Sequence, residues 1–369
     1  MGECQSSQNI SANITKVQST DVEGESLEFI FYGIVAPIII IFGIFGNVIN
    51  ICILRMPILK GVTYVYLKWL AISDIMSLLF YITFSLRQLG FQLKSYAAAV
   101  YYAHFELTLL NGFMASSMFL IVSLTIDRYF SVCLPTKFQN IHNKKQAHCA
   151  IATAYVCSLI LYLPLFFIKY ADIDKKTLDS MDKTEYIPHT NKCIVEHGVF
   201  QTYVAIKELC VRIGPILTLA VLNTQIINAF KKAMKKRNAL KNSENKNIEE
   251  NAKTGSKKFR EEKRLVSMLI GIVILTFICK IPGSIHGFIA KHADRNSFGM
   301  LLFASIADSL EVFKHSLNFC IYCLCSSQYR KAFISLISCF KVPQAFSSTY
   351  SESSSARCKA RTDEEITHE

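Results

Sequence analysis

The segment NGFMASSMFLIVSLTIDRYFSVCLPTKF, residues 111–138, decides the fold of this chain. It predicts a long apolar helix that ends in the charged triplet Asp127-Arg128-Tyr129, followed by Pro135 and a basic loop. Charged side chains are costly in the hydrocarbon of a bilayer. The triplet is therefore expected at a membrane interface, with a function there.

Long apolar runs indicate an integral membrane protein. The 369 residues are 51% hydrophobic, and the stretches 29–54 and 150–168 contain no Asp, Glu, Lys or Arg. A helix needs about 20 apolar residues to cross the hydrocarbon core of a bilayer. A β-barrel would instead show alternating strands of about 10 residues, a pattern that the sequence lacks. The expected fold class is an all-α membrane protein.

Positive charge is concentrated between the apolar runs. The formal net charge is +12, and residues 231–264 hold 13 Lys or Arg against 5 Asp or Glu. Basic loops mark the cytoplasmic side of a membrane, so this distribution argues against a nucleic-acid partner. It places the N-terminus outside and the C-terminus inside a multi-pass membrane protein. The 13 cysteines do not form two C-x-x-C motifs, the pattern that would supply four ligands to a metal ion, and no metal site is expected.

The apolar runs and basic loops together predict a seven-transmembrane helix bundle over residues 29–323. Seven spans place the two termini on opposite sides of the membrane. The basic segment 231–263 is then the third cytoplasmic loop. The spans are expected at residues 29–54, 64–88, 100–130, 147–168, 199–230, 264–290 and 299–323.

The segments outside the bundle each carry a different prediction. Residues 1–28 are polar and hold two N-glycosylation sequons, at Asn9 and Asn13. Residues 324–340 predict an amphipathic helix on the membrane surface, with Cys339 either palmitoylated or a plain interfacial thiol. The tail 341–369 is rich in Ser and Thr and is expected to be disordered.

Short motifs recur in a fixed order along the expected spans. They are, in chain order, Gly46-Asn47, Leu70-Ala71-Ile72-Ser73-Asp74, Asp127-Arg128-Tyr129, Pro164, Pro215, Cys279-Lys280-Ile281-Pro282 and Asn318-Phe319-Cys320-Ile321-Tyr322. With this ordered set the chain resembles rhodopsin-like (class A) G-protein-coupled receptors. The phrases DRYFSVCLPTKF, LNTQIINAF and SLNFCIYCLCSSQYRKAF give a narrower resemblance to invertebrate neuropeptide receptors of the FMRFamide and myosuppressin type.

The resemblance implies a ligand-controlled switch that couples to heterotrimeric G proteins. Arg128 is expected to be restrained by Asp127 and by Glu262. The equal alternative is that Glu262 is one charge of the run REEKR and has no partner. The resemblance also implies arrestin and receptor-kinase partners for the Ser/Thr-rich tail. The residues assigned to coupling and switching are Asp127, Arg128, Tyr129, Glu262, Asn318 and Tyr322.

A second set of residues predicts a polar network inside the bundle. A lone carboxylate such as Asp74 needs a partner in hydrocarbon. The family uses this position with a helix-three serine, here Ser117, to hold sodium, but Lys314 introduces an ammonium group that can replace the ion. Lys280 and Glu311 are expected to pair, either as a structural salt bridge or as a polar switch. The network comprises Asn47, Asp74, Ser117, Lys280, Glu311 and Lys314.

Charged side chains near the outer ends of the spans suggest a cavity for a peptide with basic side chains and an amidated C-terminus. Each of them is alternatively a side chain that snorkels to the interface. Leu110 stands where receptors for monoamines need an aspartate, so a monoamine ligand is not expected. The candidate cavity residues are Arg87, Gln88, Glu106, Lys207, Glu208, Arg212, His286 and Asp308.

Several departures from the family pattern leave alternatives open. Ala103 replaces the usual disulfide partner of Cys193, so Cys193 pairs with Cys4, pairs with Cys210 or stays free. Phe319 replaces a proline, which predicts a straighter last span. Rival functions are a retinal-binding photoreceptor, a seven-span transporter or channel, and a receptor for a non-peptide ligand. Enzymatic activity has no support in the motifs, and no cofactor is expected.

Overall fold

The computed structural model describes residues 24, 26–59, 61–134, 143–174, 184–243, 249–289 and 297–340, with side chains left out for residues 58, 236–262, 288 and 338–340. Asn9, Asn13 and the tail 341–369 lie outside the described residues. The side chains of Glu262 and Cys339 lie outside them as well.

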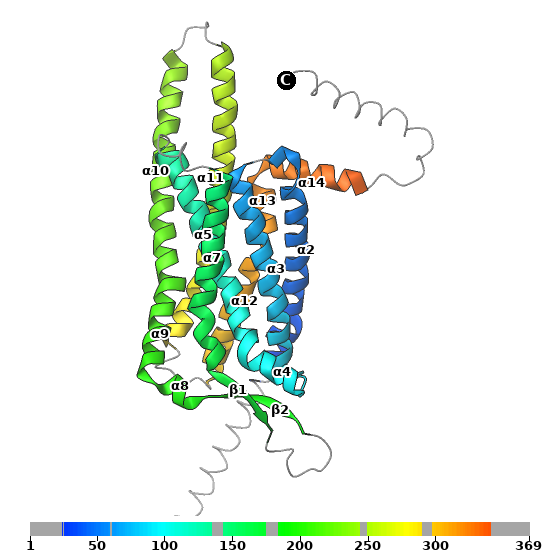
Figure 1. Cartoon of the computed structure of the whole chain (residues 1–369). Helices are drawn as coiled ribbons and strands as arrows, with labels where there is room; N and C mark the ends of the chain where they lie inside the picture. The colour runs from blue at the N-terminus through cyan, green and yellow to red at the C-terminus, as the bar shows by residue number, and fades with distance from the viewer. Residues whose placement is uncertain are drawn as a thin grey trace, which may run out of the picture.

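The described chain is mostly helical, and its long helices run alongside one another as a bundle (Figure 1). Short helical segments continue several of them: η1 (Phe29–Val35), α4 (Tyr96–Val100), η3 (Tyr101–Phe105), η4 (Leu163–Phe167), α9 (Gly198–Glu208) and η5 (Leu209–Ile213). The long helices are α2 (Ala36–Leu54), α3 (Val62–Gln88), α5 (Glu106–Cys133), α7 (Lys144–Tyr162), α10 (Gly214–Ser243), α11 (Glu249–Ile289) and α12 (Phe298–Ser316).

Two ends of the bundle can be distinguished (Figure 1). One end, called here the hairpin end, carries the antiparallel strands β1 (Lys169–Ile173) and β2 (Tyr186–Thr190) and the short helix α8 (Lys192–Glu196). The other, called the Arg128 end, carries the turn η2 (Pro57–Leu59) and the helix α14 (Ser327–Phe340). At that end α10 and α11 extend beyond the other helices.

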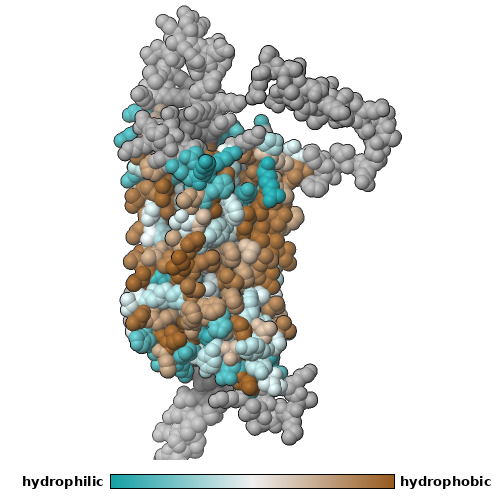
Figure 2. Space-filling view, viewed as in Figure 1, coloured by the Kyte–Doolittle hydropathy of each residue, from teal (hydrophilic) through white to brown (hydrophobic). Residues whose placement is uncertain are grey.

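The outer surface of the bundle is apolar. Figure 2 shows hydrophobic residues over most of its middle and hydrophilic ones nearer the two ends. Ile41 and Phe45, for example, are 70% and 67% exposed. Soluble proteins rarely expose apolar patches of such extent. Lipid is therefore the expected surrounding of this surface.

Five helical stretches are long and apolar enough to cross a membrane. Among the described residues these are Ser26–Leu54, Val62–Gln88, Tyr96–Cys133, Lys144–Phe167 and Lys263–Gly287. They correspond to five of the seven expected spans. The helix at the seventh expected span, α12, carries Asp308, Glu311 and Lys314 within seven residues, which lowers its hydropathy.

The last expected span is interrupted at a single residue, although Phe319 stands where the family has a proline. The chain leaves the helical pattern at Leu317, between α12 and α13 (Asn318–Cys325). The side-chain amide of Asn47 donates to the carbonyl of His315 at 2.8 Å. In a regular helix this carbonyl accepts from the amide four residues later. Competition from Asn47 therefore explains the interruption without a proline.

The basic segment 231–263 is largely helical, because α10 continues to Ser243 and α11 begins at Glu249. Its Lys, Glu and Ala residues have high helix propensity.

The two cysteines Cys193 and Cys210, one of the disulfide pairs considered from the sequence, are both free thiols in the structure.

Gly43 on α2 marks a close approach between helices. A methyl group built there would lie 2.6 Å from Leu78 Cδ1 and 2.9 Å from Ser316 Cβ. We expect Gly43→Ala to lower the free energy of unfolding by about 1–3 kcal/mol through overpacking. Thermal unfolding of the detergent-purified protein measures this change.

Gly33→Ala is the matched control, because its added methyl group would meet Phe29 at 3.4 Å, an ordinary contact. Equal midpoints for the two variants would contradict the expected overpacking at Gly43.

Candidate functional site

The charged triplet lies at the last turns of α5, at the Arg128 end of the bundle. Arg128 is only 5% exposed, although it is fully ionised. Its Nη2 and Nε atoms donate to Asp127 Oδ2 at 2.5 and 3.1 Å. Neighbouring residues on a helix do not normally face each other, so the long arginine side chain must fold back to make this pair. The expected Asp127–Arg128 contact is present.

A chain of polar contacts links α14 to the bundle near this end. The Tyr329 hydroxyl donates to Asn50 Oδ1, and Asn50 Nδ2 donates to Asn47 Oδ1 at 3.3 Å. Asn47 in turn binds the His315 carbonyl. Tyr322 packs its ring against Tyr329, with centroids 5.5 Å apart. Asn50 and Tyr329 did not stand out in the sequence as polar-network residues, because each looks like an ordinary helix residue without its partners.

Asp74 lies at the centre of a fully buried polar cluster. Its carboxylate accepts from Ser117 Oγ at 2.7 Å and from Asn318 Nδ2 at 2.5 Å. Lys314 Nζ donates to Ser117 Oγ at 2.5 Å and lies 3.7 Å from Asp74 Oδ1. The ammonium group therefore reaches the carboxylate both directly and through the serine.

His315 also belongs to this cluster, although its position in the sequence gave no sign of it. Its Nδ1 lies 2.6 Å from Asp74 Oδ1, and it must carry the proton to donate to a carboxylate. Nε2 has no hydrogen-bond partner within the described part of the chain. The arrangement fits a neutral Nδ1–H tautomer, which leaves Lys314 as the counter-charge of Asp74.

A network of five charged side chains lies nearer the hairpin end. Lys280 Nζ and Arg212 Nη2 each lie 3.4 Å from a different oxygen of Glu311. Arg212 Nε also lies 3.1 Å from Glu208 Oε2, and Lys207 Nζ lies 3.0 Å from Glu208 Oε1. The expected Lys280–Glu311 pair is thus present, within a larger network.

A cavity of about 270 Å³ adjoins this network at the hairpin end. Of the eight candidate cavity residues, the structure places four in its wall: Glu208, Arg212, His286 and Asp308. Gly283 and Gly287 line the same wall on α11, where the absence of side chains leaves room. Ser284, between them on α11, adds a hydroxyl group to the wall.

The other four candidates lie outside this wall. Arg87 Nε donates to Glu106 Oε2 at 2.7 Å, so these two residues bind each other between α3 and α5. Lys207 pairs with Glu208 and lies over the Tyr162 ring at 5.5 Å. Gln88 is the last residue of α3.

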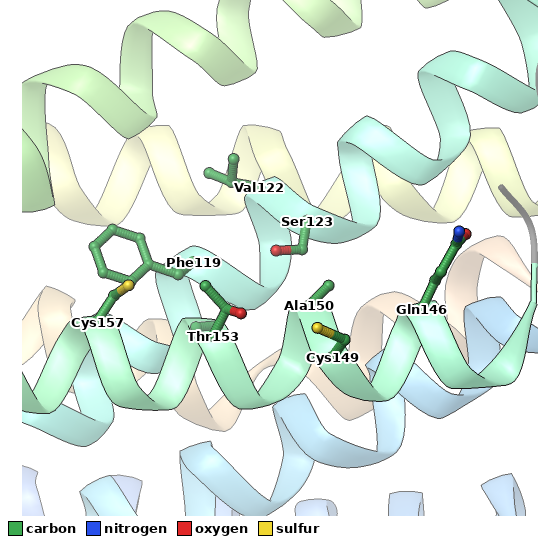
Figure 3. A pocket seen from close by; sticks show the side chains of 9 residues that line it. Phe119, Val122, Ser123, Gln146, Cys149, Ala150, Thr153 and Cys157 are labelled. Atoms are coloured by element: carbon green, nitrogen blue, oxygen red, sulfur yellow. The ribbon is translucent and has the colours of Figure 1, made fainter.

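A second hollow of about 550 Å³ opens on the side of the bundle between α5 and α7. Phe119, Val122 and Ser123 of α5 line it together with Ala150 and Thr153 of α7, and the Phe119 ring lies towards α7 (Figure 3). The two cysteines of its wall, Cys149 and Cys157, are exposed. This hollow faces the apolar outer surface and is separate from the charged cavity.

The comparison with known proteins decides the family. Residues 46–328, which include both the Arg128 end and the charged cavity, match the family described as 7 transmembrane receptor (rhodopsin family). The chain belongs to the rhodopsin family of seven-transmembrane receptors. It is therefore a multi-pass plasma-membrane protein and a G-protein-coupled signalling receptor.

Relatives of this rhodopsin-family receptor include nematode and insect receptors. It is 32% identical over 325 residues to the probable G-protein coupled receptor AH9.1 of Caenorhabditis elegans, which covers 86% of this chain and 78% of that protein. It is 29% identical to the probable G-protein coupled receptor B0563.6 of Caenorhabditis elegans, over 86% of this chain and 71% of that protein. It is 23% identical to the FMRFamide receptor of Drosophila melanogaster, over 85% of this chain and 55% of that protein.

Proposed function

We propose that this receptor is activated by an extracellular peptide that enters the charged cavity at the hairpin end. The observation that carries the proposal is the wall of that cavity, where Glu208, Arg212 and Asp308 supply charges of both signs. Peptides offer charged and hydrogen-bonding groups that such a wall can bind. The similarity to an FMRFamide receptor and to the neuromedin U receptor homolog nmur-2 supports a peptide ligand.

The proposal includes a topology. In it, α10 with its preceding segments, and α12 with α13, are the two spans beyond the five apolar helices. The N-terminus with its sequons is extracellular, and the basic extension of α10 and α11 is cytoplasmic. In α14, Arg330 and Lys331 are exposed while Tyr329 and Ala332 are buried, which supports an amphipathic helix on the inner membrane surface. The tail 341–369 would bind arrestin and receptor kinases.

The test is a peptide screen on cells that express the full chain with an N-terminal epitope tag. Calcium and cyclic-AMP readouts are expected to respond to at least one amidated neuropeptide in a panel that includes FMRFamide and neuromedin U. Arg128→Ala is expected to abolish the response while the tag stays detectable on unpermeabilised cells. A response to a lipid or a monoamine, with none to any peptide, would overturn the ligand class.

Asp127→Asn is expected to raise ligand-independent signalling. The substitution removes the carboxylate that holds Arg128 at 2.5 Å. The pair is largely buried, with the two side chains 6% and 11% exposed. Its loss is therefore expected to shift the two-state equilibrium by more than the about 1 kcal/mol of an exposed pair, that is, by more than roughly fivefold. Basal second-messenger production, normalised to surface expression, measures the change.

The control is Asp172→Asn in β1, which removes a carboxylate at the hairpin end of the bundle. Basal signalling that stays at the parent level in Asp127→Asn would show that this pair does not restrain the receptor.

A further inference from the structure

The charged cavity contains one carboxylate that the network of salt bridges leaves out. Glu311 has Lys280 and Arg212 as partners, and Glu208 has Arg212 and Lys207. Asp308 accepts a hydrogen bond from the Tyr32 hydroxyl at 3.2 Å. No basic nitrogen lies within 4.0 Å of its carboxylate in the described ranges of the chain. Asp308 therefore carries a negative charge with a neutral partner.

The position of Asp308 on α12 makes this charge costly. Asp308 and Glu311 are three residues apart, which places them on the same face of the helix. Two carboxylates on one face of a membrane helix repel each other, and neither is in bulk water. Two bases of this region, Arg212 and Lys280, are already bound to Glu311. An additional cation next to Asp308 would remove this repulsion.

The cavity gives such a cation access to Asp308. Asp308 is partly exposed and forms part of the cavity wall, whereas Lys280 and Glu311 do not line it. The volume of about 270 Å³ is below the roughly 300–1,000 Å³ of sites that enclose a drug-sized ligand. It suits one end or one side chain of a peptide. Arg212 also lines the wall, but its charge is shared between two carboxylates.

We propose that Asp308 is the specificity-determining residue of this cavity and binds a guanidinium or ammonium group of the ligand. This inference rests on the proposed peptide-receptor function for its biological meaning, since it names the chemical class of the group that enters. A guanidinium group fits best, because it can bind a carboxylate through two parallel hydrogen bonds.

The first test needs no agonist. Thermal unfolding of the purified full-length receptor is followed with increasing argininamide, and with citrullinamide as the uncharged match. Argininamide is expected to raise the midpoint by at least about 2 °C, and citrullinamide to leave it unchanged, because only a ligand of the folded state stabilises it. Equal shifts with the two compounds, or no shift with either, would overturn the proposal.

Asp308→Asn assigns the effect to this residue. The asparagine oxygen can still accept from the Tyr32 hydroxyl, so the fold should persist, and Asp308→Ser replaces it if expression fails. The argininamide shift is expected to disappear in this variant and to persist in Glu185→Gln, which removes an exposed carboxylate that pairs with Lys94. An undiminished shift in Asp308→Asn would overturn the assignment.

The second test uses any basic peptide that activates the receptor in the screen. Asp308→Asn is expected to reduce the potency of this peptide by about 10- to 100-fold. A version of the peptide with citrulline in place of arginine should have the same potency on the parent receptor and on Asp308→Asn. An equal loss for both versions would contradict a charge contact. If argininamide depends on Asp308 but no peptide activates the receptor, the proposed peptide function fails while this inference stands.

Discussion

Lys314→Met is expected to lower the free energy of unfolding of the receptor by about 3–5 kcal/mol relative to the parent protein. The substitution keeps the side-chain volume but removes the ammonium group that lies 3.7 Å from Asp74. Lys314 is 1% exposed, and Asp74 is completely buried. The carboxylate would keep its hydrogen bonds from Ser117 and Asn318 but lose its counter-charge. Thermal unfolding in detergent at constant ionic strength measures the loss.

The double variant Asp74→Asn/Lys314→Met separates the lost pair from lost packing. It removes both charges, so it is expected to recover most of the stability, as neutral replacements of buried ion pairs commonly do. A double variant as unstable as Lys314→Met alone would show that packing of the lysine stem, and not its charge, stabilises this part of the bundle.

Sodium supplies an independent readout of the same cluster. The parent receptor is expected to have the same unfolding midpoint in sodium chloride and in N-methylglucamine chloride, because Lys314 already neutralises Asp74. In Lys314→Asn the midpoint should rise with sodium, since Asp74 and Ser117 then offer oxygen ligands to a free cation. A strong sodium effect on the parent protein that Asp74→Asn removes would contradict the ammonium as a built-in substitute for the ion.

This cluster shows how far the sequence alone predicts a buried site. The cost of an unpaired charge within a membrane span predicts that Asp74 has partners. The choice of Ser117 comes from the resemblance to the family, and that of Lys314 from its place one turn before Asn318. His315 could not be found in this way, because its role depends on the rotation of α12 that brings its ring to Asp74. The interruption at Leu317 escaped for a similar reason, since it arises from the Asn47 side chain on another helix.

The charged residues near the hairpin end show the opposite limit. Their types predicted a polar region, but eight residues of both signs can pair in many ways. Arg87 and Glu106 bind each other, whereas Glu208 and Asp308 line a cavity. Nothing in the order of these residues distinguishes the two outcomes, because they are decided by which helices approach each other. The apolar runs, in contrast, directly predicted the five described helices that are long and apolar enough to cross a membrane.

Arg87→Met is expected to lower the free energy of unfolding by about 3 kcal/mol, because it leaves a buried carboxylate without its partner. Glu106 is completely buried and lies 2.7 Å from Arg87 Nε. The loss is placed at the lower end of the range for such pairs because Lys169 of β1 lies close enough to interact with both. Burial, and secondarily the positive charge of Arg87, lower the pKa of Lys169, whereas the Glu106 carboxylate raises it. Lys169 therefore interacts electrostatically with both members of the pair. Thermal unfolding again provides the measurement.

Arg87→Met/Glu106→Gln is the matched control, because it removes both charges at similar volume. The double variant should be more stable than Arg87→Met by about 2 kcal/mol, since a neutral amide costs less to bury than an unpaired carboxylate. Both variants should keep the argininamide shift that depends on Asp308, because Arg87 and Glu106 lie outside the wall of the charged cavity. Loss of that shift in the stable double variant would place this pair in the ligand site, whereas its retention limits the pair to holding α3 against α5.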